Sequence, residues 1–320
     1  MYENILYFGL VCKKLVQGLG FLESFCLICL LIKDSHSDMK KVLLELCLLL
    51  CILSGCGSAT DLYVATYNIR YRAAADADGG NAWQDRKGAV AKLILSHGFD
   101  VVGTQEGDQA QLDDLQALLP GYAYIAHPYG GADGNLHNCA TFYKEDKYEV
   151  IDQGTFWYSE TPDVKSLGWD ASDLRICNWG KFRDKVTKKE FFLFNSHFYW
   201  RKKTAKERSG GVLVQKLKAI AGNAPVICTG DFNSREDTPQ IKDILAVVND
   251  AYRISETAPS GCEETDLGGG NFEGSAKARI DYVFVSPGIR VRDYAVIEDR
   301  RENGHYPSDH LPVACHVTLP

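Results

Sequence analysis

The chain has 320 residues, of which 45% are hydrophobic and 24% are charged. This is ordinary globular composition, and the length is enough for one large domain or two small ones. The formal net charge is −7. Such an acidic balance argues against a protein that binds nucleic acid tightly and without specificity, because affinity for phosphate backbones comes from Lys and Arg. A nuclease with a local basic patch remains open.

The N-terminal segment is expected to lie outside the fold. Met39-Lys40-Lys41 precedes an apolar run, residues 42–53, and small residues follow it. A positive start, a short apolar run and small residues before a cleavage site are typical of a secretory signal. The run is shorter than the about 20 residues that a spanning helix needs. Its end, Leu53-Ser54-Gly55-Cys56, resembles the lipobox of bacterial lipoproteins, although Glu45 interrupts the apolar run.

This pattern predicts three segments. Residues 1–38 are interpreted as an upstream extension from a misplaced start codon, residues 39–55 as a lipoprotein signal peptide, and residues 56–320 as one domain. The lipobox implies a lipid on the thiol of Cys56, and therefore anchoring to a membrane of the cell envelope, on its periplasmic side or at the cell surface. We expect the protein to be a monomer. The alternative is a genuine N-terminal hydrophobic hairpin or anchor.

The cysteine pattern does not indicate a disulfide framework. Of 11 cysteines, five follow Cys56, and they are widely and irregularly spaced. An odd number at such spacing is not a paired scaffold. Cys228 and Cys315 lie in apolar runs, so we expect them to be small buried hydrophobic residues.

The first half of the mature chain alternates strand-like and helical patterns. Val90, Leu93 and Ile94 share one face at helical spacing, and so do Leu112 and Leu115. The predicted helices are residues 84–97 and 109–119. The predicted strands are residues 62–69, 99–103, 122–126, 139–143 and 149–158.

The second half continues the alternation. Strands are predicted at 181–186 and 190–198, joined by a hairpin turn at Thr187-Lys188-Lys189. Helices are predicted at 204–221 and 239–247. A loop rich in Gly, Glu and Ser covers 255–278. Short strands are predicted at 225–228, 280–285, 291–297 and 313–317. Mixed strands and helices with long connections suit a layered α/β domain.

Six polar segments stand at the ends of strand-like runs. The runs are apolar, so the polar groups should emerge where each strand ends, and a fold can bring such ends into one cleft. Carboxylate, amide and imidazole groups of this kind suit Mg²⁺ binding and the cleavage of a phosphoester bond. The segments contribute Asn68, Glu106, His197, Asp231, Asn233, Asp281, Asp309 and His310.

In order and spacing, the six segments resemble the endonuclease/exonuclease/phosphatase superfamily, which includes deoxyribonuclease I, sphingomyelinases and inositol polyphosphate phosphatases. The resemblance runs from about residue 62 to residue 317. It implies an α/β fold, a four-layer sandwich of two packed mixed β-sheets flanked by helices. It places the site where the strand ends of both sheets meet. The competing explanation, chance capping of loops by carboxylates, would have to hold at six places.

The resemblance also implies a divalent metal, with Mg²⁺ expected and Mn²⁺ or Ca²⁺ as alternatives. Glu106 and Asp309 are the predicted carboxylate ligands. Asn68 is predicted to join them, through its amide oxygen or by holding Glu106 and a metal-bound water.

The remaining polar groups resemble the family's catalytic residues. Asp231 would align or deprotonate the attacking water, and Asn233 would donate to a phosphate oxygen, although Gly-Asp-Phe-Asn could also be a simple Asx turn. His310 and Asp281 resemble the histidine–aspartate pair that contacts the phosphate or the leaving group. His197 resembles the second phosphate-contacting histidine.

The sequence departs from the family around His197. Many relatives carry His-Phe-Asp-His where this chain has His197-Phe198-Tyr199-Trp200, and the stretch 136–140 lacks the glutamate that supports the first histidine in deoxyribonuclease-like members. His197 is therefore predicted to lack an acidic partner. Arg175 is a candidate phosphate contact, with a surface salt bridge as its alternative.

The same region offers hints about substrate. Tyr199 and Trp200 bring aromatic groups next to the site, which could stack on a base or a sugar or pack in the core. The basic run 201–208 follows, and it could recruit an anionic substrate or be a solvated helix start. We therefore predict a metal-dependent phosphodiesterase, nuclease or phosphatase acting on nucleic acid, a phospholipid headgroup or a phosphorylated sugar. A catalytically silent binding lipoprotein on the same fold is the alternative.

Overall fold

The computed structural model of the chain describes residues 59–131 and 134–320. The predicted signal peptide and the predicted lipid-anchored Cys56 lie outside the described residues. Among the described helices, none has the length and apolar character that crossing a membrane requires.

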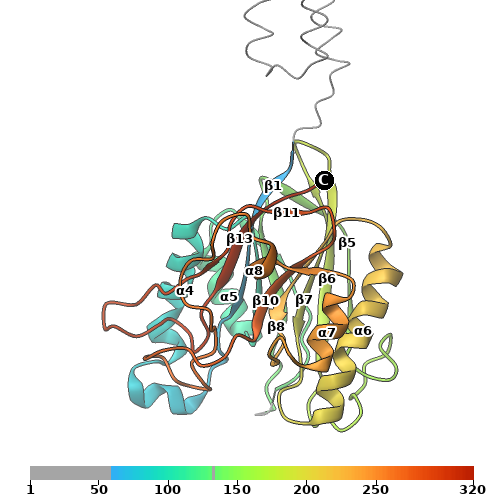
Figure 1. Cartoon of the computed structure of the whole chain (residues 1–320). Coiled ribbons are helices and arrows are strands. Elements are labelled where there is room, and N and C mark those ends of the chain that lie inside the picture. Colours follow the sequence, from blue (N-terminus) through green and yellow to red (C-terminus); the bar gives the residue numbers. More distant parts are fainter. Residues whose placement is uncertain (1–58, 132–133) are drawn as a thin grey trace, which may run out of the picture. The chain divides into compact units, whose positions relative to one another are not determined.

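Two mixed β-sheets lie at the centre of the described fold (Figure 1). The first is seven-stranded in the described part, with β11, β13, β1, β2, β4 and β3 side by side and β12 paired to β13. Its strands are β1 (Asp61–Asn68), β2 (Val101–Gln105), β3 (Tyr122–Ile125), β4 (Ala140–Lys144), β11 (Arg290–Val291), β12 (Ala295–Val296) and β13 (Val313–Thr318).

The second sheet is six-stranded in the described part and has the order β5, β6, β7, β8, β10, β9. The predicted hairpin joins β6 to β7 through an antiparallel ladder. Its strands are β5 (Tyr148–Trp157), β6 (Ile176–Asp184), β7 (Glu190–His197), β8 (Val226–Asp231), β9 (Asn249–Asp250) and β10 (Asp281–Val285).

Strand direction brings the polar segments to one end of the sandwich. Each sheet has a parallel pair at its centre, β1 with β2 and β7 with β8. The parallel strands end at Asn68, Gln105, His197 and Asp231. The antiparallel neighbours β10 and β13 begin at the same end, since Asp281 lies opposite Asp231 and Val313 opposite Thr66.

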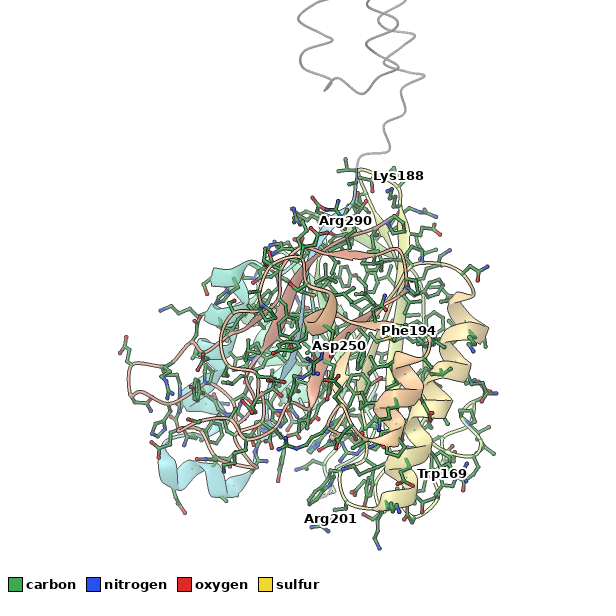
Figure 2. All side chains as sticks on the ribbon, viewed as in Figure 1. Trp169, Lys188, Phe194, Arg201, Asp250 and Arg290 are labelled. Carbon is green, nitrogen blue, oxygen red and sulfur yellow. The ribbon has the colours of Figure 1, made fainter. Side chains whose placement is uncertain are left out.

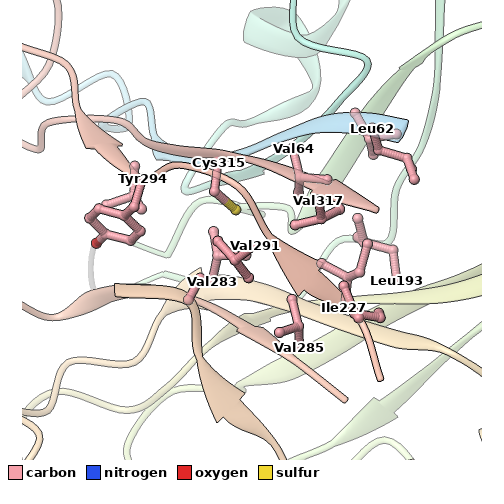
Figure 3. Packing of buried hydrophobic residues seen from close by; sticks show 14 of the residues in the cluster. Leu62, Val64, Leu193, Ile227, Val283, Val285, Val291, Tyr294, Cys315 and Val317 are labelled. Carbon is pink, nitrogen blue, oxygen red and sulfur yellow. The ribbon is translucent and has the colours of Figure 1, made fainter. Parts of the chain in front are cut away.

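The two-residue period of a strand sorts the side chains between the faces of each sheet. In β8, Ile227 packs between the sheets and Cys228 packs outward. Asp231 has the same parity as Ile227, so it points between the sheets where the apolar core ends. The same parity relates His197 to Leu193 and Asp281 to Val283. Figure 3 shows Leu193, Ile227 and Val283 in the core between the sheets.

Helices cover the outer faces and complete four layers. Two helices pack on the first sheet through a core that includes Val90 and Leu112, and two pack on the second through a core that includes Leu213 and Ile244. Each parallel pair is joined across its sheet by one of the longer helices, as parallel strands require. The helices are η1 (Ala74–Gly79), α4 (Trp83–His97), α5 (Gln109–Leu118), α6 (Lys203–Ala221), α7 (Pro239–Leu245) and α8 (Ala251–Ile254).

The predicted four-layer α/β sandwich is thus confirmed, and two predicted strands are wrong in detail. The strand expected at 181–186 is β6, which begins at Ile176 and ends at Asp184. Residues 291–297 form two short strands, β11 and β12. Between them the carboxylate of Asp293 accepts from the backbone N–H of His316 at 3.0 Å and takes the place of a ladder bond. Cys228 and Cys315 are free and buried, as predicted, and no described cysteine is in a disulfide.

Candidate active site

The polar groups predicted from the strand ends meet at the end of the sandwich where β7 and β8 finish. Arg201, just beyond β7, lies at this end of the molecule, and Lys188, at the tip of the β6–β7 hairpin, lies at the other (Figure 2). Asp231 is the central group, buried to 1% exposure. One carboxylate oxygen of Asp231, Oδ2, lies 3.0 Å from Asn68 Nδ2, 3.4 Å from His197 Nε2 and 3.8 Å from His310 Nε2.

The charge state of Asp231 follows from these neighbours. Burial alone would raise its pKa, but His197 and His310 outweigh burial and hold the pKa well below the ordinary value. The other oxygen, Oδ1, accepts from the backbone N–H of Asn233 at 2.9 Å. Asp231 is therefore a fixed carboxylate, and a carboxylate of low basicity is better suited to aligning a water than to removing its proton.

Asn233 has a left-handed backbone, with φ of 48°. The Asx turn that the sequence offered as an alternative is present, because Asp231 accepts from the Asn233 backbone. The side-chain Nδ2 of Asn233 donates to the carbonyl of Phe198 at 3.1 Å. A phosphate contact by Asn233 stays a prediction, and the structure shows that its amide is oriented by Phe198.

Glu106 follows β2 directly and also has a left-handed backbone, with φ of 71°. Its two oxygens accept from Asn68 Nδ2 at 3.2 Å and from the backbone N–H of Tyr71 at 3.1 Å. Burial would raise its pKa, but His197, His310 and Arg70 lower it to about 2. Glu106 is thus ionised and held in place. The amide oxygen of Asn68 accepts from the backbone N–H of Arg70 at 3.0 Å, so holding Glu106 is the role of Asn68 that fits this arrangement.

Asp309 is the second predicted metal ligand. Its Oδ2 accepts from the backbone N–H of Gly270 at 2.7 Å and lies 3.4 Å from Arg70 Nη1. Burial raises the pKa of Asp309, although His310 and Arg70 oppose that effect. Arg70 also pairs with Asp76 of η1. Arg70 therefore reduces the charge repulsion that Asp309 and Glu106 would otherwise feel.

His310 and Asp281 form the predicted pair, with 2.8 Å between Nδ1 and Oδ2. Burial opposes a charge on His310, but Asp281 and Asp231 outweigh it and hold the pKa of His310 well above its ordinary value. Burial raises the pKa of Asp281 to about 6, although His310 opposes this. Thr265, in the long loop, donates to the same oxygen of Asp281 at 2.6 Å. At neutral pH the pair is an imidazolium beside a carboxylate.

His197 has different partners. Its Nδ1 lies 2.8 Å from the hydroxyl of Tyr129 and 2.9 Å from Nη1 of Arg175. The acidic neighbour of the ring is Asp231, whose Oδ2 lies 3.4 Å from the other nitrogen, Nε2. Burial, first, and then Arg175 lower the pKa of His197, and the opposing effect of Asp231 is smaller. His197 is therefore neutral beside a permanent cation.

Arg175 and Tyr199 were predicted to contact substrate. The Arg175 guanidinium is nearly buried, at 6% exposure, and its Nε has no hydrogen-bond partner among the described residues. This N–H is therefore unpaired but closed to solvent, and the part of Arg175 that reaches the site is Nη1, next to His197. Tyr199 is buried, with its hydroxyl 3.0 Å from Ser172 Oγ and Arg175 beside its ring. This placement makes Tyr199 a support for Arg175, and the exposed aromatic group is Trp200, at 42%.

The donor set fits a hard divalent cation. Glu106 lies next to an ionised Asp231, because both accept from Nδ2 of Asn68, and Asp309 shares the neighbour Arg70 with Glu106. A cation would offset the repulsion among these carboxylates. Glu106, His197 and Asp231 place one ligand atom each within 4.8 Å of one another, and so do Asp231, Asp281 and His310. In the second trio Asp281 is already engaged by His310 and Thr265. Glu106 is therefore the carboxylate of these trios that would hold the metal, and the second predicted ligand, Asp309, belongs to neither trio.

Sequence reasoning missed Arg86, which holds the backbone around the predicted metal ligands Glu106 and Asp309. Arg86 is fully buried in α4, and its guanidinium donates to the backbone carbonyls of Arg70 at 2.6 Å and Tyr71 at 3.1 Å, and also to that of Ile69. It also lies 3.4 Å from the carbonyl of Pro307, which precedes Asp309 by two residues. The signal was available, since Arg86 shares helical spacing with the core residue Val90.

Asn195 was also missed as a separate feature. It lies in β7, two residues before His197, and is fully buried between the sheets. Its Nδ2 donates to the carbonyls of Thr104 and Ala140, both at 2.9 Å, and its Oδ1 accepts from Gln105 at 2.7 Å. Asn195 thus ties the second sheet to the first directly behind the site.

The site combines strand ends from two sheets, a cluster of carboxylates and two hydrogen-bonded histidines. This combination defines a phosphoesterase-like fold and site, and the comparisons with known proteins agree. Residues 65–310 match the model of the endonuclease/exonuclease/phosphatase family, so the chain belongs to that family.

Two solved structures from Bacteroides thetaiotaomicron are similar along most of the chain. One is an endonuclease/exonuclease/phosphatase family protein, 36% identical, covering 82% of this chain and 96% of its own, with a TM-score of 0.76. The other is a mannosyl-6-phosphatase, 37% identical, covering 80% of this chain and 99% of its own, with a TM-score of 0.74. Nocturnin from Drosophila melanogaster is 26% identical over 74% of this chain, and the match spans 42% of nocturnin's length.

Proposed function

We propose that the protein is a divalent-metal-dependent hydrolase of phosphoesters and that water attacks phosphorus in line with the leaving oxygen. The observation that carries this proposal is the convergence on Asp231 of groups from both sheets, Asn68 from the first and His197 from the second, with His310 beside them. Family members act on phosphoester bonds, which supports the reaction class.

Each residue of the site has a separate proposed role in the reaction. Asp231, a carboxylate of low basicity, accepts a hydrogen bond from the attacking water and orients it. Both protons of that water stay on the phosphate product, which then returns one proton to the neutral His310. Glu106 and Asp309 would hold the cation, with Asn68 fixing Glu106; we expect Mg²⁺, with Mn²⁺ or Ca²⁺ as alternatives. When bound, the cation supplies charge neutralisation at the phosphoryl oxygens. The imidazolium of His310 donates a proton toward the phosphate or leaving oxygen. Arg175, whose Nη1 lies 2.9 Å from Nδ1 of His197, places a permanent positive charge beside that ring.

For the substrate we propose a phosphorylated sugar that is cleaved as a monoester. Support comes from the similarity to the mannosyl-6-phosphatase at 37% identity along most of the chain. The net charge of −7 also disfavours long nucleic acid. The exposed Trp200 and the adjacent Arg201, whose guanidinium lies 4.2 Å from the centre of the Trp200 ring, offer a rim on which a sugar ring can lie.

A second candidate is a diesterase that acts on short nucleic acid. The same Trp200–Arg201 stack favours it, because exposed aromatic rings and cations bind bases and phosphates. Lys202 and Lys203 extend this basic rim at the start of α6.

We also propose that the protein works in the cell envelope as a monomer anchored through a lipid on Cys56. The lipobox-like Leu53-Ser54-Gly55-Cys56 supports this location. A catalytically silent binding lipoprotein stays the alternative, and it is disfavoured because Glu106, Asp231 and His310 are all in place.

The test is hydrolysis by the purified protein with Mg²⁺ and with EDTA. The panel is mannose 6-phosphate, p-nitrophenyl phosphate, bis-p-nitrophenyl phosphate, RNA and DNA. EDTA-sensitive release of phosphate from the monoesters, abolished by Asp231→Ala, is the expected result. Cleavage of diesters or nucleic acid alone would replace the first candidate with the second. Metal binding without turnover of any substrate would favour the binding lipoprotein.

A further inference from the structure

Two buried side chains meet at one nitrogen of His197. The Tyr129 hydroxyl and Arg175 Nη1 lie 2.8 Å and 2.9 Å from Nδ1. Tyr129 is 1% exposed and His197 is 3% exposed, so little water competes with these contacts. Among the described residues, no carboxylate is recorded on Nδ1.

The chemistry of the guanidinium decides where the ring proton lies. A guanidinium has five N–H donors and no acceptor, so the nitrogen that it contacts must accept. Nδ1 of His197 is therefore unprotonated, and the proton of the neutral ring is on Nε2. That nitrogen lies 3.4 Å from Asp231 Oδ2 and faces the site.

The two partners are themselves held rigidly. The Tyr129 backbone N–H donates to the carbonyl of His137 at 2.7 Å, and its ring packs with Cys139 and Ile176. The Tyr129 ring stands edge-on to His197, at 5.8 Å and 88°. The carbonyl of Arg175 accepts from the backbone N–H of Tyr158 at 2.9 Å. The orientation of the imidazole is thus fixed by its Nδ1 contacts with Tyr129 and Arg175.

We propose that Tyr129 and Arg175 are positioning residues that hold His197 as the neutral Nε2–H tautomer, so that His197 serves as a hydrogen-bond donor to the phosphoryl group and not as the acid that releases a proton. The catalytic half of this statement rests on the proposed hydrolase function, and the tautomer does not. The burial of His197 and the field of Arg175 both disfavour the imidazolium, which agrees with the hydrogen-bond geometry.

The tautomer is measured directly by NMR on protein labelled with ¹⁵N in histidine, without metal and at neutral pH. We expect His197, assigned by loss of its signals in His197→Gln, to show a proton on Nε2 and a bare Nδ1. His310 in the same spectrum should show protons on both nitrogens. An Nδ1–H tautomer or a doubly protonated ring at His197 would overturn the proposal, whatever the enzyme's activity.

Variants test the catalytic half. Tyr129→Phe removes one contact and should lower kcat by about 10-fold with KM unchanged, because a less well oriented donor loses part of the about 100-fold that such a donor supplies in the transition state. Arg175→Lys keeps a donor-only cation and should keep the tautomer, whereas Arg175→Met should lose it. Tyr122→Phe is the matched control: it removes a buried hydroxyl bond to the Phe99 carbonyl and should leave kcat unchanged.

The outcomes separate the two proposals. A wild-type protein without any phosphoesterase activity would remove the proposed function and leave the tautomer to be judged from the spectrum. An active wild type in which Tyr129→Phe and Arg175→Met change neither kcat nor the His197 signals would overturn the positioning role. If Arg175→Met does not fold, Arg175→Lys and Tyr129→Phe still decide.

Discussion

The two active-site histidines come from different sheets, and groups of opposite charge contact their Nδ1 atoms. His310 precedes β13 in the first sheet and has the carboxylate of Asp281 on Nδ1 at 2.8 Å. His197 ends β7 in the second sheet and has the guanidinium of Arg175 on the same ring nitrogen at 2.9 Å. Both rings are buried, to 7% and 3% exposure.

The comparison teaches that burial alone does not set the charge of a histidine. Burial lowers the pKa of both rings, but two carboxylates reverse that effect at His310, and Arg175 adds to it at His197. A carboxylate or a guanidinium on the same nitrogen is enough to make one ring a cation and the other neutral. One site therefore holds a proton donor and a fixed hydrogen-bond donor side by side.

The largest expected effect is on kcat when either histidine is replaced by alanine. His310→Ala removes the proton donor and should lower kcat by about 1,000-fold, within the usual range for general acid catalysis. His197→Ala removes a hydrogen-bond donor and should cost about 100-fold. Steady-state kinetics with the best substrate of the panel gives both values. Equal losses, or a larger loss for His197→Ala, would contradict the assignment of roles.

The acid limb of the pH profile tests the His310 side. The folded-state pKa of Asp281 is raised to about 6 from 3.8, so the carboxylate becomes protonated as pH falls through about 6. The imidazolium of His310 then loses its anion, and kcat/KM should fall below that pH. Asp281→Asn should lower kcat by about 100-fold and abolish this limb. A limb that persists unchanged in Asp281→Asn would assign it to another group.

Arg86→Met leaves both histidines intact and tests the predicted metal ligands separately. The variant loses the donors to the carbonyl of Tyr71, whose N–H binds Glu106, and to the carbonyl of Pro307, two residues before Asp309. We expect metal affinity to fall by about 10–100-fold, as for other groups that support metal ligands. Titration calorimetry measures this. Arg183→Met, which removes a half-exposed pair with Glu190, is the control and should bind metal normally.

Gly103→Ala tests the contact between the two sheets behind the site, where Gly103 of β2 faces Asn195 of β7 and Thr229 of β8. A Cβ at Gly103 would lie 2.3 Å from Thr229 Oγ1 and 2.7 Å from Asn195 Oδ1. Overpacking of this kind should lower the free energy of unfolding by about 1–3 kcal/mol. Gly211→Ala in α6 is the control, since a Cβ there meets nothing within 4 Å and should be neutral or stabilising. Denaturant unfolding would show the prediction to be wrong if both variants behaved alike.

The smallest expected effect concerns the rim on the His197 side. Lys202→Ala with Lys203→Ala should raise KM for anionic substrates by about 2–5-fold at low salt, with kcat unchanged, because screened surface charges steer weakly. Lys185→Ala with Lys188→Ala is the matched control. Both residues lie between β6 and β7, and Lys188 is at the end of the domain opposite to Arg201 (Figure 2). A salt dependence of KM equal to that of the wild type would refute recruitment by the rim.

Much of the fold could be predicted from the sequence because local patterns carry it. Helical spacing located α4, α5 and α6 within one or two residues, and the apolar runs located the central strands. The prediction failed at residues 291–297, where the Asp293 side chain takes a backbone position in the ladder. A side chain that replaces a ladder bond leaves no mark on hydrophobic periodicity.

The candidate site divides in the same way. The sequence by itself determined which polar groups stand at strand ends, such as Asp231 and His310, and that the stretch 136–140 offers no glutamate to His197. Only the tertiary structure decided that Tyr129 and Arg175 take the carboxylate's place and that Arg86 holds the metal side. These contacts join residues far apart in the chain, and periodicity and local motifs record near neighbours only. The charge on each histidine is therefore a property of the packed sandwich and not of the segment that carries it.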